Sequence, residues 1–281
     1  MVKEFSGSSC KWIEIRPRSG LFDLDLIGVW RYRELLYFLV WRELKIRYKQ
    51  AVFGVGWAIF QPVLALIIFV AIFGYFARLP SNGTPYPLFV FTAVLPWTYF
   101  AEAVRRSGAG LVGDAELIRK IYFPRLVIPL AMVLAPVIDF LISSLILLIL
   151  LAWYGVMPTI YVVSVPVFLL ISVMLALSVG LWLGPLNVRF RDIMHTLPFL
   201  IQIWMYASPI VYPLNMVPER WRLLYSLNPM VGVIEGLRWA LLGRGTPNLI
   251  AIGLSAAFIS VALTGGLVFF RRMERSFADV I

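Results

Sequence analysis

Long apolar stretches recur six times between Gly54 and Phe270. A helix needs about 20 mostly apolar residues to cross the hydrocarbon core of a bilayer. The pattern therefore predicts six membrane-spanning helices, at residues 54–76, 87–104, 126–152, 161–186, 197–213 and 247–270. A further apolar region, 223–243, is interrupted by Asn228-Pro229, Gly232 and Gly236. We expect a pair of short re-entrant or surface helices there, on the external side, rather than a seventh span.

The basic residues between these stretches fall mainly in alternate gaps. Of the 25 Lys and Arg residues, 20 lie before the first span, in 105–125, in 187–196 or after the last span. Cytoplasmic loops of membrane proteins carry such an excess of Lys and Arg. We therefore expect both chain ends in the cytoplasm, because a seventh span would move Arg271, Arg272 and Arg275 to the outside.

The spans divide the chain into four parts. We expect a cytoplasmic lead at 1–27, an amphipathic interface helix at 28–50, a six-span domain at 51–272 and a cytoplasmic tail at 273–281. In the interface helix, Trp and other large apolar residues alternate with Arg and Lys, which is typical of a helix in the headgroup plane. The fold class is an all-α integral membrane protein.

The gap between the second and third spans has two halves. The small residues from Ser107 to Gly113 suggest a hinge, and Pro96 is expected to interrupt the second span. Asp114 is expected to cap a short basic helix at 115–123, which Pro124 ends. A short helix between two spans is a natural docking element for a partner protein.

Composition supports a membrane protein, with 61% hydrophobic and 14% charged residues and a mean hydropathy of +0.87. The net charge of +10 follows from the inside bias and from contact with anionic lipid headgroups, so we expect no nucleic-acid partner. Cys10 is the only cysteine, which excludes an intrachain disulfide. The first residues lack a signal-peptide layout, so the first span is expected to act as an uncleaved insertion signal.

Residues for catalysis are scarce. The chain has no GxxxxGK[ST] phosphate-binding loop, and His195 is its only histidine, so we expect no catalytic residue, no metal site and no cofactor on this chain. Asp139 is the one carboxylate predicted deep within a span. Without a basic residue near it in sequence it makes a poor proton relay, and we expect a structural role.

Aromatic residues make up 15% of the chain. Some act as interfacial anchors, whereas others are candidates to line a pathway in which ring faces meet sugar rings. The candidates are Trp57, Phe60, Tyr75, Tyr99, Trp204, Tyr206 and Tyr212. Gly180/Gly184 and Gly232/Gly236 have the small-xxx-small spacing of close helix contacts, which is a weak signal for dimerisation.

Several motifs together resemble a known family. RELKIRYK at 42–49 leads through Phe53-Gly54 to Trp57 and Pro62, and LIRKIYFPR at 117–125 is followed by Pro129-Leu130. NVRFRD at 187–192, Pro209 with Tyr212-Pro213, and Asn228-Pro229 complete the set. In this order they resemble the membrane subunit of polysaccharide-exporting ABC transporters, from about Leu35 to Arg272.

The resemblance implies a homodimeric permease in the bacterial cytoplasmic membrane that pairs with two copies of a separate ATPase, where ATP and Mg bind. It implies export of lipid-linked glycans such as O-antigen, capsule or teichoic-acid-like polymers. The ATPase-coupling residues would be Glu116, Leu117, Ile118, Arg119, Lys120, Ile121, Tyr122, Phe123, Arg189, Arg191 and Asp192. Candidates to bind membrane-lipid headgroups or the pyrophosphate of a lipid carrier are Arg42, Lys45, Arg47 and Lys49.

Three alternatives remain open from the residues alone. One is a permease of the same superfamily for a drug or small lipid. A second is an intramembrane glycan-processing enzyme, which would need clustered acids or a metal site. A third is a channel without an energy source, which would have no use for the helix at 115–123.

Overall fold

The computed structural model describes residues 26–49, 56–243 and 248–274. Most of the predicted lead and most of the predicted tail lie outside these residues. The described residues are mostly helical and contain no strand, which confirms the all-α fold. The elements are α1 (Leu26–Arg31), α2 (Arg33–Lys49), α3 (Gly56–Phe69), the π-helix η1 (Val70–Phe76), α4 (Tyr86–Gly113), α5 (Ala115–Lys120), α6 (Val127–Leu134), α7 (Pro136–Trp153), the 3-10 helix η2 (Ile160–Ser164), α8 (Val165–Arg189), α9 (Ile193–Tyr206), the 3-10 turn η3 (Leu214–Met216), α10 (Glu219–Tyr225), α11 (Pro229–Leu242) and α12 (Leu249–Glu274).

Within the described residues, five helical stretches are long and apolar enough to cross a membrane. They are Gly56–Phe76, Tyr86–Gly113, Val127–Trp153, Ile160–Arg189 and Leu249–Glu274. The remaining predicted span, 197–213, corresponds to α9, whose 14 residues measure about 21 Å. Helix α9 ends at Tyr206, shortly before two prolines at 209 and 213, which cannot donate helical hydrogen bonds. The count of six spans therefore stays a prediction.

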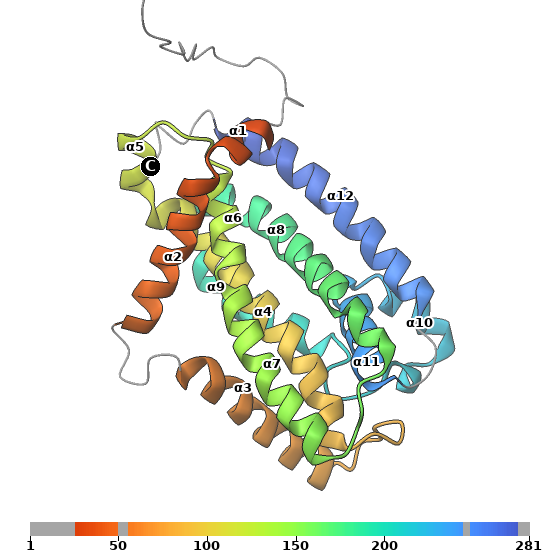
Figure 1. Cartoon of the computed structure of the whole chain (residues 1–281). Helices are drawn as coiled ribbons and strands as arrows, with labels where there is room; N and C mark the ends of the chain where they lie inside the picture. The colour runs from red at the N-terminus through yellow and green to blue at the C-terminus, as the bar shows by residue number, and fades with distance from the viewer. Residues whose placement is uncertain (1–25, 50–55, 244–247, 275–281) are drawn as a thin grey trace, which may run out of the picture.

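Helix α4 forms the centre of the bundle (Figure 1). Helices α3, α6, α7, α8, α9 and α11 all pack on it, and nearly every side chain from Leu88 to Val104 is buried. Pro96 lies inside the helix without interrupting it, contrary to the prediction. The predicted hinge is also wrong, because α4 continues through Ser107 to Gly113. These small residues permit close packing instead: a methyl group added at Gly110 would lie 2.8 Å from Met132 Cγ.

The region 223–243 is broken as predicted. Helix α10 ends at Tyr225 and α11 begins at Pro229, with the Asn228 side chain accepting a hydrogen bond from the Met230 amide at 3.1 Å. This side-chain cap and a proline at the first helical position both favour a helix start. Helix α11 is buried among α4, α8 and α12. Entry of the pair into the membrane stays a prediction.

The glycine pairs are used inside the protomer. Gly180 faces Ser107 of α4, Gly232 faces Ser255 of α12, and Gly236 faces the Phe168 ring of α8. A methyl group added at these positions would meet a side-chain atom at 2.1, 2.3 and 2.0 Å, respectively. The small-xxx-small spacing thus marks contacts between helices of one chain, and it supplies no dimerisation surface.

We expect Gly236→Ala to destabilise the protein by about 1–3 kcal/mol, because overpacking a tight contact displaces its neighbours. Thermal unfolding in detergent measures the effect. Gly253→Ala on α12 is the matched control, since nothing lies within 4 Å of the added methyl group. Phe168→Leu should recover part of the loss in the Gly236→Ala background. Equal unfolding temperatures for the two alanine variants would contradict this packing.

Candidate functional site

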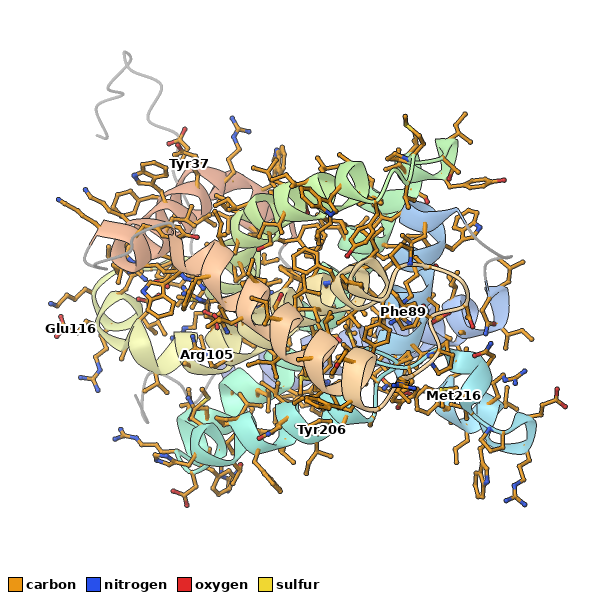
Figure 2. The ribbon with its side chains drawn as sticks, turned by 90° about the horizontal axis from the view of Figure 1, so that it is seen from below. Tyr37, Phe89, Arg105, Glu116, Tyr206 and Met216 are labelled. Carbon is orange, nitrogen blue, oxygen red and sulfur yellow. The ribbon has the colours of Figure 1, made fainter. Side chains whose placement is uncertain are left out.

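One end of the molecule collects the segments predicted to be basic and cytoplasmic. Helix α5, α1 and the last turn of α12 lie there (Figure 1), and the Arg125 guanidinium donates to the Glu274 carbonyl. The end of α8 joins them, because Asn187 Nδ2 donates to the Gly108 carbonyl at 3.0 Å. We call this the basic end. Figure 2 shows Glu116 and Tyr37 toward it and Met216 at the opposite end, which we call the far end.

Helix α5 is a short amphipathic helix with one buried apolar face and one exposed charged face. Ile118 and Phe123 are buried in a cluster with Leu39 of α2, whereas the other face is exposed, with Lys120 Nζ donating to Glu116 at 2.8 Å. The helix ends at Lys120, three residues earlier than predicted. Of the predicted coupling residues, the exposed ones are Glu116, Arg119, Lys120, Ile121, Tyr122, Arg189, Arg191 and Asp192, and Leu117 is half-buried.

Asp114 holds α5 to the interface helix. The predicted side-chain cap is absent; the carboxylate instead accepts two hydrogen bonds from Arg42 Nη2, at 2.6 and 2.8 Å. Arg42 lies on α2, which crosses the long helices obliquely and packs on α6 (Figure 1). The start of α5 is thus fastened to α2 by an ion pair that spans 72 residues of sequence.

Burial affects both partners of this pair. Burial raises the pKa of the Asp114 carboxyl despite the opposing charge of Arg42. For Arg42, burial acts to lower the pKa, but the hydrogen bonds and charges of Asp114 and Glu43 outweigh it and the pKa rises. Because the pKa of this acid is raised in the fold, stability falls as the pH rises from the ordinary pKa of the carboxyl to the raised one. The pair therefore fixes the position of α5 and adds little net stability.

The same region of α2 is joined to α4. Arg106 donates to Glu43 at 3.1 Å and to Glu102 at 2.6 Å, so it bridges the two helices. Glu102 also accepts hydrogen bonds from Arg105, at 2.8 to 3.0 Å. Hydrogen bonds between ionised groups are the strong ones in proteins. Helices α2, α4 and α5 are therefore connected through charged side chains at the basic end.

Asp139 is the third anchor of α2. Its carboxylate accepts hydrogen bonds from the Arg47 guanidinium and the Tyr48 hydroxyl, both near the end of α2. Sequence reasoning found no basic partner for Asp139 because Arg47 lies 92 residues away. Because both partners lie on α2, the Asp139 carboxylate connects α2 to α7. This agrees with the structural role expected from the sequence.

We expect Asp139→Asn to lower the unfolding temperature and to reduce export only in proportion to lost protein, because the substitution removes the charge that Arg47 pairs with. Abundance in the membrane and export per molecule are measured together. The matched control is Ser144→Ala, five residues further along α7, whose hydroxyl donates to the Phe140 carbonyl of its own helix. Normal abundance and assembly with no export would assign Asp139 a direct part in transport.

The four headgroup candidates divide into two pairs. Arg42 and Arg47 are engaged by Asp114 and Asp139, as described above. Lys45 and Lys49 are exposed on α2, next to the exposed aromatic side chains of Tyr37, Phe38 and Trp41. A face of aromatic and basic residues fits the interfacial region of a membrane.

The aromatic candidates differ in their exposure and position. Trp57 and Phe60 on α3 and Tyr75 in η1 are exposed. Tyr99 is only 3% exposed, and its hydroxyl donates to the Val133 carbonyl at 3.1 Å, so it lies inside the protomer. Tyr206 and Tyr212 line a small pocket of about 150 Å³ between η1 and the end of α9.

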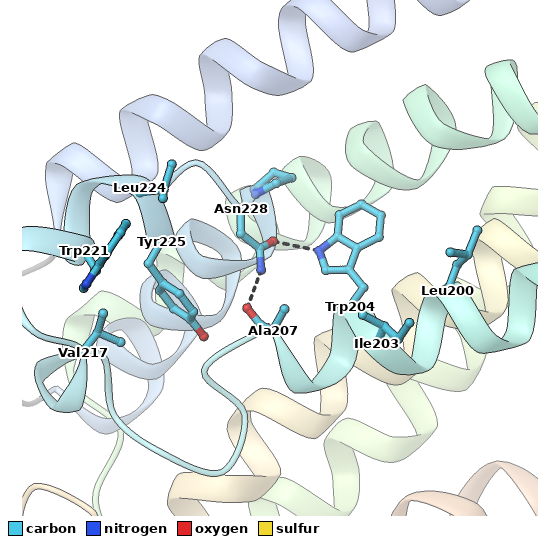
Figure 3. Close-up of a pocket in the computed structure, with 10 residues that line it drawn as sticks. Leu200, Ile203, Trp204, Ala207, Val217, Trp221, Leu224, Tyr225 and Asn228 are labelled. Atoms are coloured by element: carbon cyan, nitrogen blue, oxygen red, sulfur yellow. Dashed lines mark hydrogen bonds between the residues drawn. The ribbon is translucent and has the colours of Figure 1, made fainter.

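A larger pocket of about 630 Å³ lies between α9, α10 and the start of α11 (Figure 3). Trp204, Trp221 and Tyr225 line it with several aliphatic side chains. Asn228 stabilises one side of the pocket. Its side chain accepts a hydrogen bond from Trp204 Nε1 at 2.8 Å and donates one to the Ala207 carbonyl at 2.9 Å. Sequence reasoning missed Trp221 and Tyr225, although the Asn-Pro helix start beside them was visible.

The far end is held by a buried arginine of α11. Arg238 of α11 donates to the Ile210 carbonyl at 2.7 Å and to Glu235 at 2.9 Å. Its guanidinium carbon lies 3.7 Å from the centroid of the Phe89 ring. Arg238 therefore joins α11, α4 and the segment after α9.

A bundle of long apolar helices with charged side chains gathered at one end is typical of a multi-pass membrane protein. The chain belongs to the ABC-2 type transporter family, whose model matches residues 34–242.

Named relatives cover nearly all of the chain. It is 31% identical over 255 residues to the O-antigen export system permease protein RfbA of Myxococcus xanthus, covering 90% of this chain and 97% of that protein. It is 30% identical over 251 residues to the protein of the same name from Klebsiella pneumoniae, covering 88% and 95%. The Polysialic acid transport protein KpsM of Escherichia coli is 27% identical over 240 residues, covering 84% and 92%.

Proposed function

We propose that this chain is the membrane subunit of an ATP-driven exporter that moves a lipid-linked polysaccharide out across the bacterial cytoplasmic membrane. The cargo class is an O-antigen, capsule or teichoic-acid-like polymer. The observation that carries the proposal is likeness over nearly the full length to permeases named for O-antigen export and polysialic acid transport. A drug or small-lipid permease and a glycan-processing enzyme are the alternatives.

The proposed assembly contains two copies of this chain and two copies of a separate ATPase, which holds ATP and Mg. The basic end faces the cytoplasm, together with both chain ends. The ATPase docks on the exposed face of α5 and on the α8–α9 turn, where Arg189, Arg191 and Asp192 are exposed. Closure of the ATPase pair pushes α5, and the Arg42–Asp114 pair passes the movement to α2.

A strongly hydrated polymer cannot cross hydrocarbon, so it needs a lined pathway. The pathway lies between the two protomers, with Trp57 and Phe60 at its inner part and Tyr206 toward the outer end, where exposed ring faces are available to sugars. Lys45 and Lys49 attract the phosphate groups of a lipid carrier or of membrane lipids.

Purification from native membranes in a gentle detergent tests the partners. The proposal predicts an ATPase at a ratio near one to one with this chain. Depletion of the chain in cells tests the cargo, and glycan should disappear from the surface and accumulate inside on its lipid carrier. Normal surface glycan after depletion, with altered drug sensitivity, would favour the small-molecule permease instead.

A further inference from the structure

The central helix α4 is mostly buried but has one partly exposed face that carries polar residues. Between Leu88 and Arg105, the only residues of α4 that are not buried are Thr98, Ala101, Glu102 and Arg105. Their spacing of three and four residues places them on one helix face. Helices α3 and α9 both pack on α4, and Figure 2 shows Arg105 near the basic end, in the region between their ribbons.

Arg105 is the most exposed arginine of the charged network. Its side chain is 54% exposed, against 15% for Arg106 and 22% for Arg47. Arg106 and Arg47 each have a second carboxylate, Glu43 and Asp139, respectively. Among the described residues, Arg105 pairs only with Glu102, which Arg106 also binds and which lies 3.7 Å from Arg47. The carboxylate is therefore shared among three guanidinium groups.

Part of the Arg105 guanidinium has no acceptor within the described part of the chain. Its Nε and Nη2 groups donate to Glu102, whereas its Nη1 group donates to no acceptor among the described residues. A guanidinium with a free edge binds the two oxygens of a phosphate through parallel hydrogen bonds. An ionised, exposed group on the central helix of a membrane protein faces water or a ligand rather than lipid tails.

We propose that Arg105 is a phosphate-binding residue at the inner end of the transport pathway and that Glu102 is its internal competitor. An arriving phosphate takes the free Nη1 edge and then draws the guanidinium from Glu102, which retains Arg106. The phosphate comes from the pyrophosphate linkage of a lipid carrier or from a phospholipid headgroup. The choice of a carrier pyrophosphate rests on the proposed function.

Binding of farnesyl diphosphate to the full chain in phosphatidylcholine nanodiscs tests the first source. We expect Arg105→Gln to weaken binding by about tenfold, as for loss of a hydrogen bond to a charged group. Glu102→Gln should strengthen binding several-fold, because it removes the competitor. Arg105→Lys should give an intermediate affinity. Arg272→Gln, an exposed arginine at the end of α12, is the matched control, and farnesol without phosphate is the control ligand.

Retention of phosphatidylglycerol during purification tests the second source. If Arg105→Gln lowers this retention but leaves farnesyl diphosphate binding unchanged, Arg105 binds a headgroup phosphate. If neither quantity changes, or if Arg105→Gln and Glu102→Gln weaken binding alike, the phosphate site is refuted. Both readouts are independent of export, so a chain that exports no glycan but shows these affinity changes would refute the proposed function and leave the site standing.

Discussion

Replacing Arg42 by glutamine is expected to reduce glycan export by about tenfold while the ATPase still binds, because coupling between two sites is typically worth 1–3 kcal/mol. The substitution removes both hydrogen bonds from α2 to Asp114 at the start of α5. A push on α5 then has no charged connection to the interface helix. Export per complex and ATPase co-purification are measured on the same membranes.

Asp114 provides the reciprocal test of this connection. Asp114→Asn should reduce export less than Arg42→Gln does. Asp114→Asn removes the buried charge, whereas Arg42→Gln leaves the Asp114 charge buried and unpaired. The exchange Arg42→Asp with Asp114→Arg should restore part of the export. Arg33→Gln, an exposed arginine on the same helix, is the matched control. Normal export by Arg42→Gln at normal abundance would show that the movement of α5 reaches the bundle by another route.

Replacing Arg238 by methionine is expected to destabilise the fold by about 3–5 kcal/mol, the usual loss when one partner of a buried ion pair is removed. The Ile210 carbonyl loses its donor, Glu235 loses its partner, and the contact with the Phe89 ring disappears. Folded yield and unfolding temperature in detergent measure the effect.

The control for Arg238 is Arg220→Met on α10, where the side chain is exposed. Glu235→Gln should be less damaging than Arg238→Met, because it keeps the arginine and its carbonyl acceptor. Equal stability of the Arg238 and Arg220 variants would show that the far end does not depend on this arginine.

Much of the fold follows from the hydrophobic pattern. The length of apolar stretches predicted five of the observed long helices, although the predicted second span, 87–104, ends nine residues before α4 does. Asn228-Pro229 predicted the break between α10 and α11. The errors have physical reasons. Glycine permits both flexibility and close packing, so Ser107 to Gly113 suggested a hinge where the structure has a tightly packed helix. The stop of α9 at Tyr206 was missed because apolar residues continue to Tyr212.

The charged contacts could not be predicted from the sequence because the partners in each contact lie far apart along the chain. Asp114 looked like a helix cap from its position, but a guanidinium 72 residues away competes successfully for its carboxylate. Asp139 appeared isolated for the same reason. The coupling residues of α5 were found by likeness to a family, and their part in binding an ATPase stays a prediction.

Transport into inside-out membrane vesicles tests the central claim most directly. Vesicles from cells that make this chain, its ATPase and the lipid-linked glycan are supplied with ATP, and glycan protected in the lumen is measured. The account predicts ATP-dependent accumulation that disappears without this chain and falls about tenfold with Arg42→Gln. Equal lumenal glycan with and without the chain, in the presence of ATP, would contradict it.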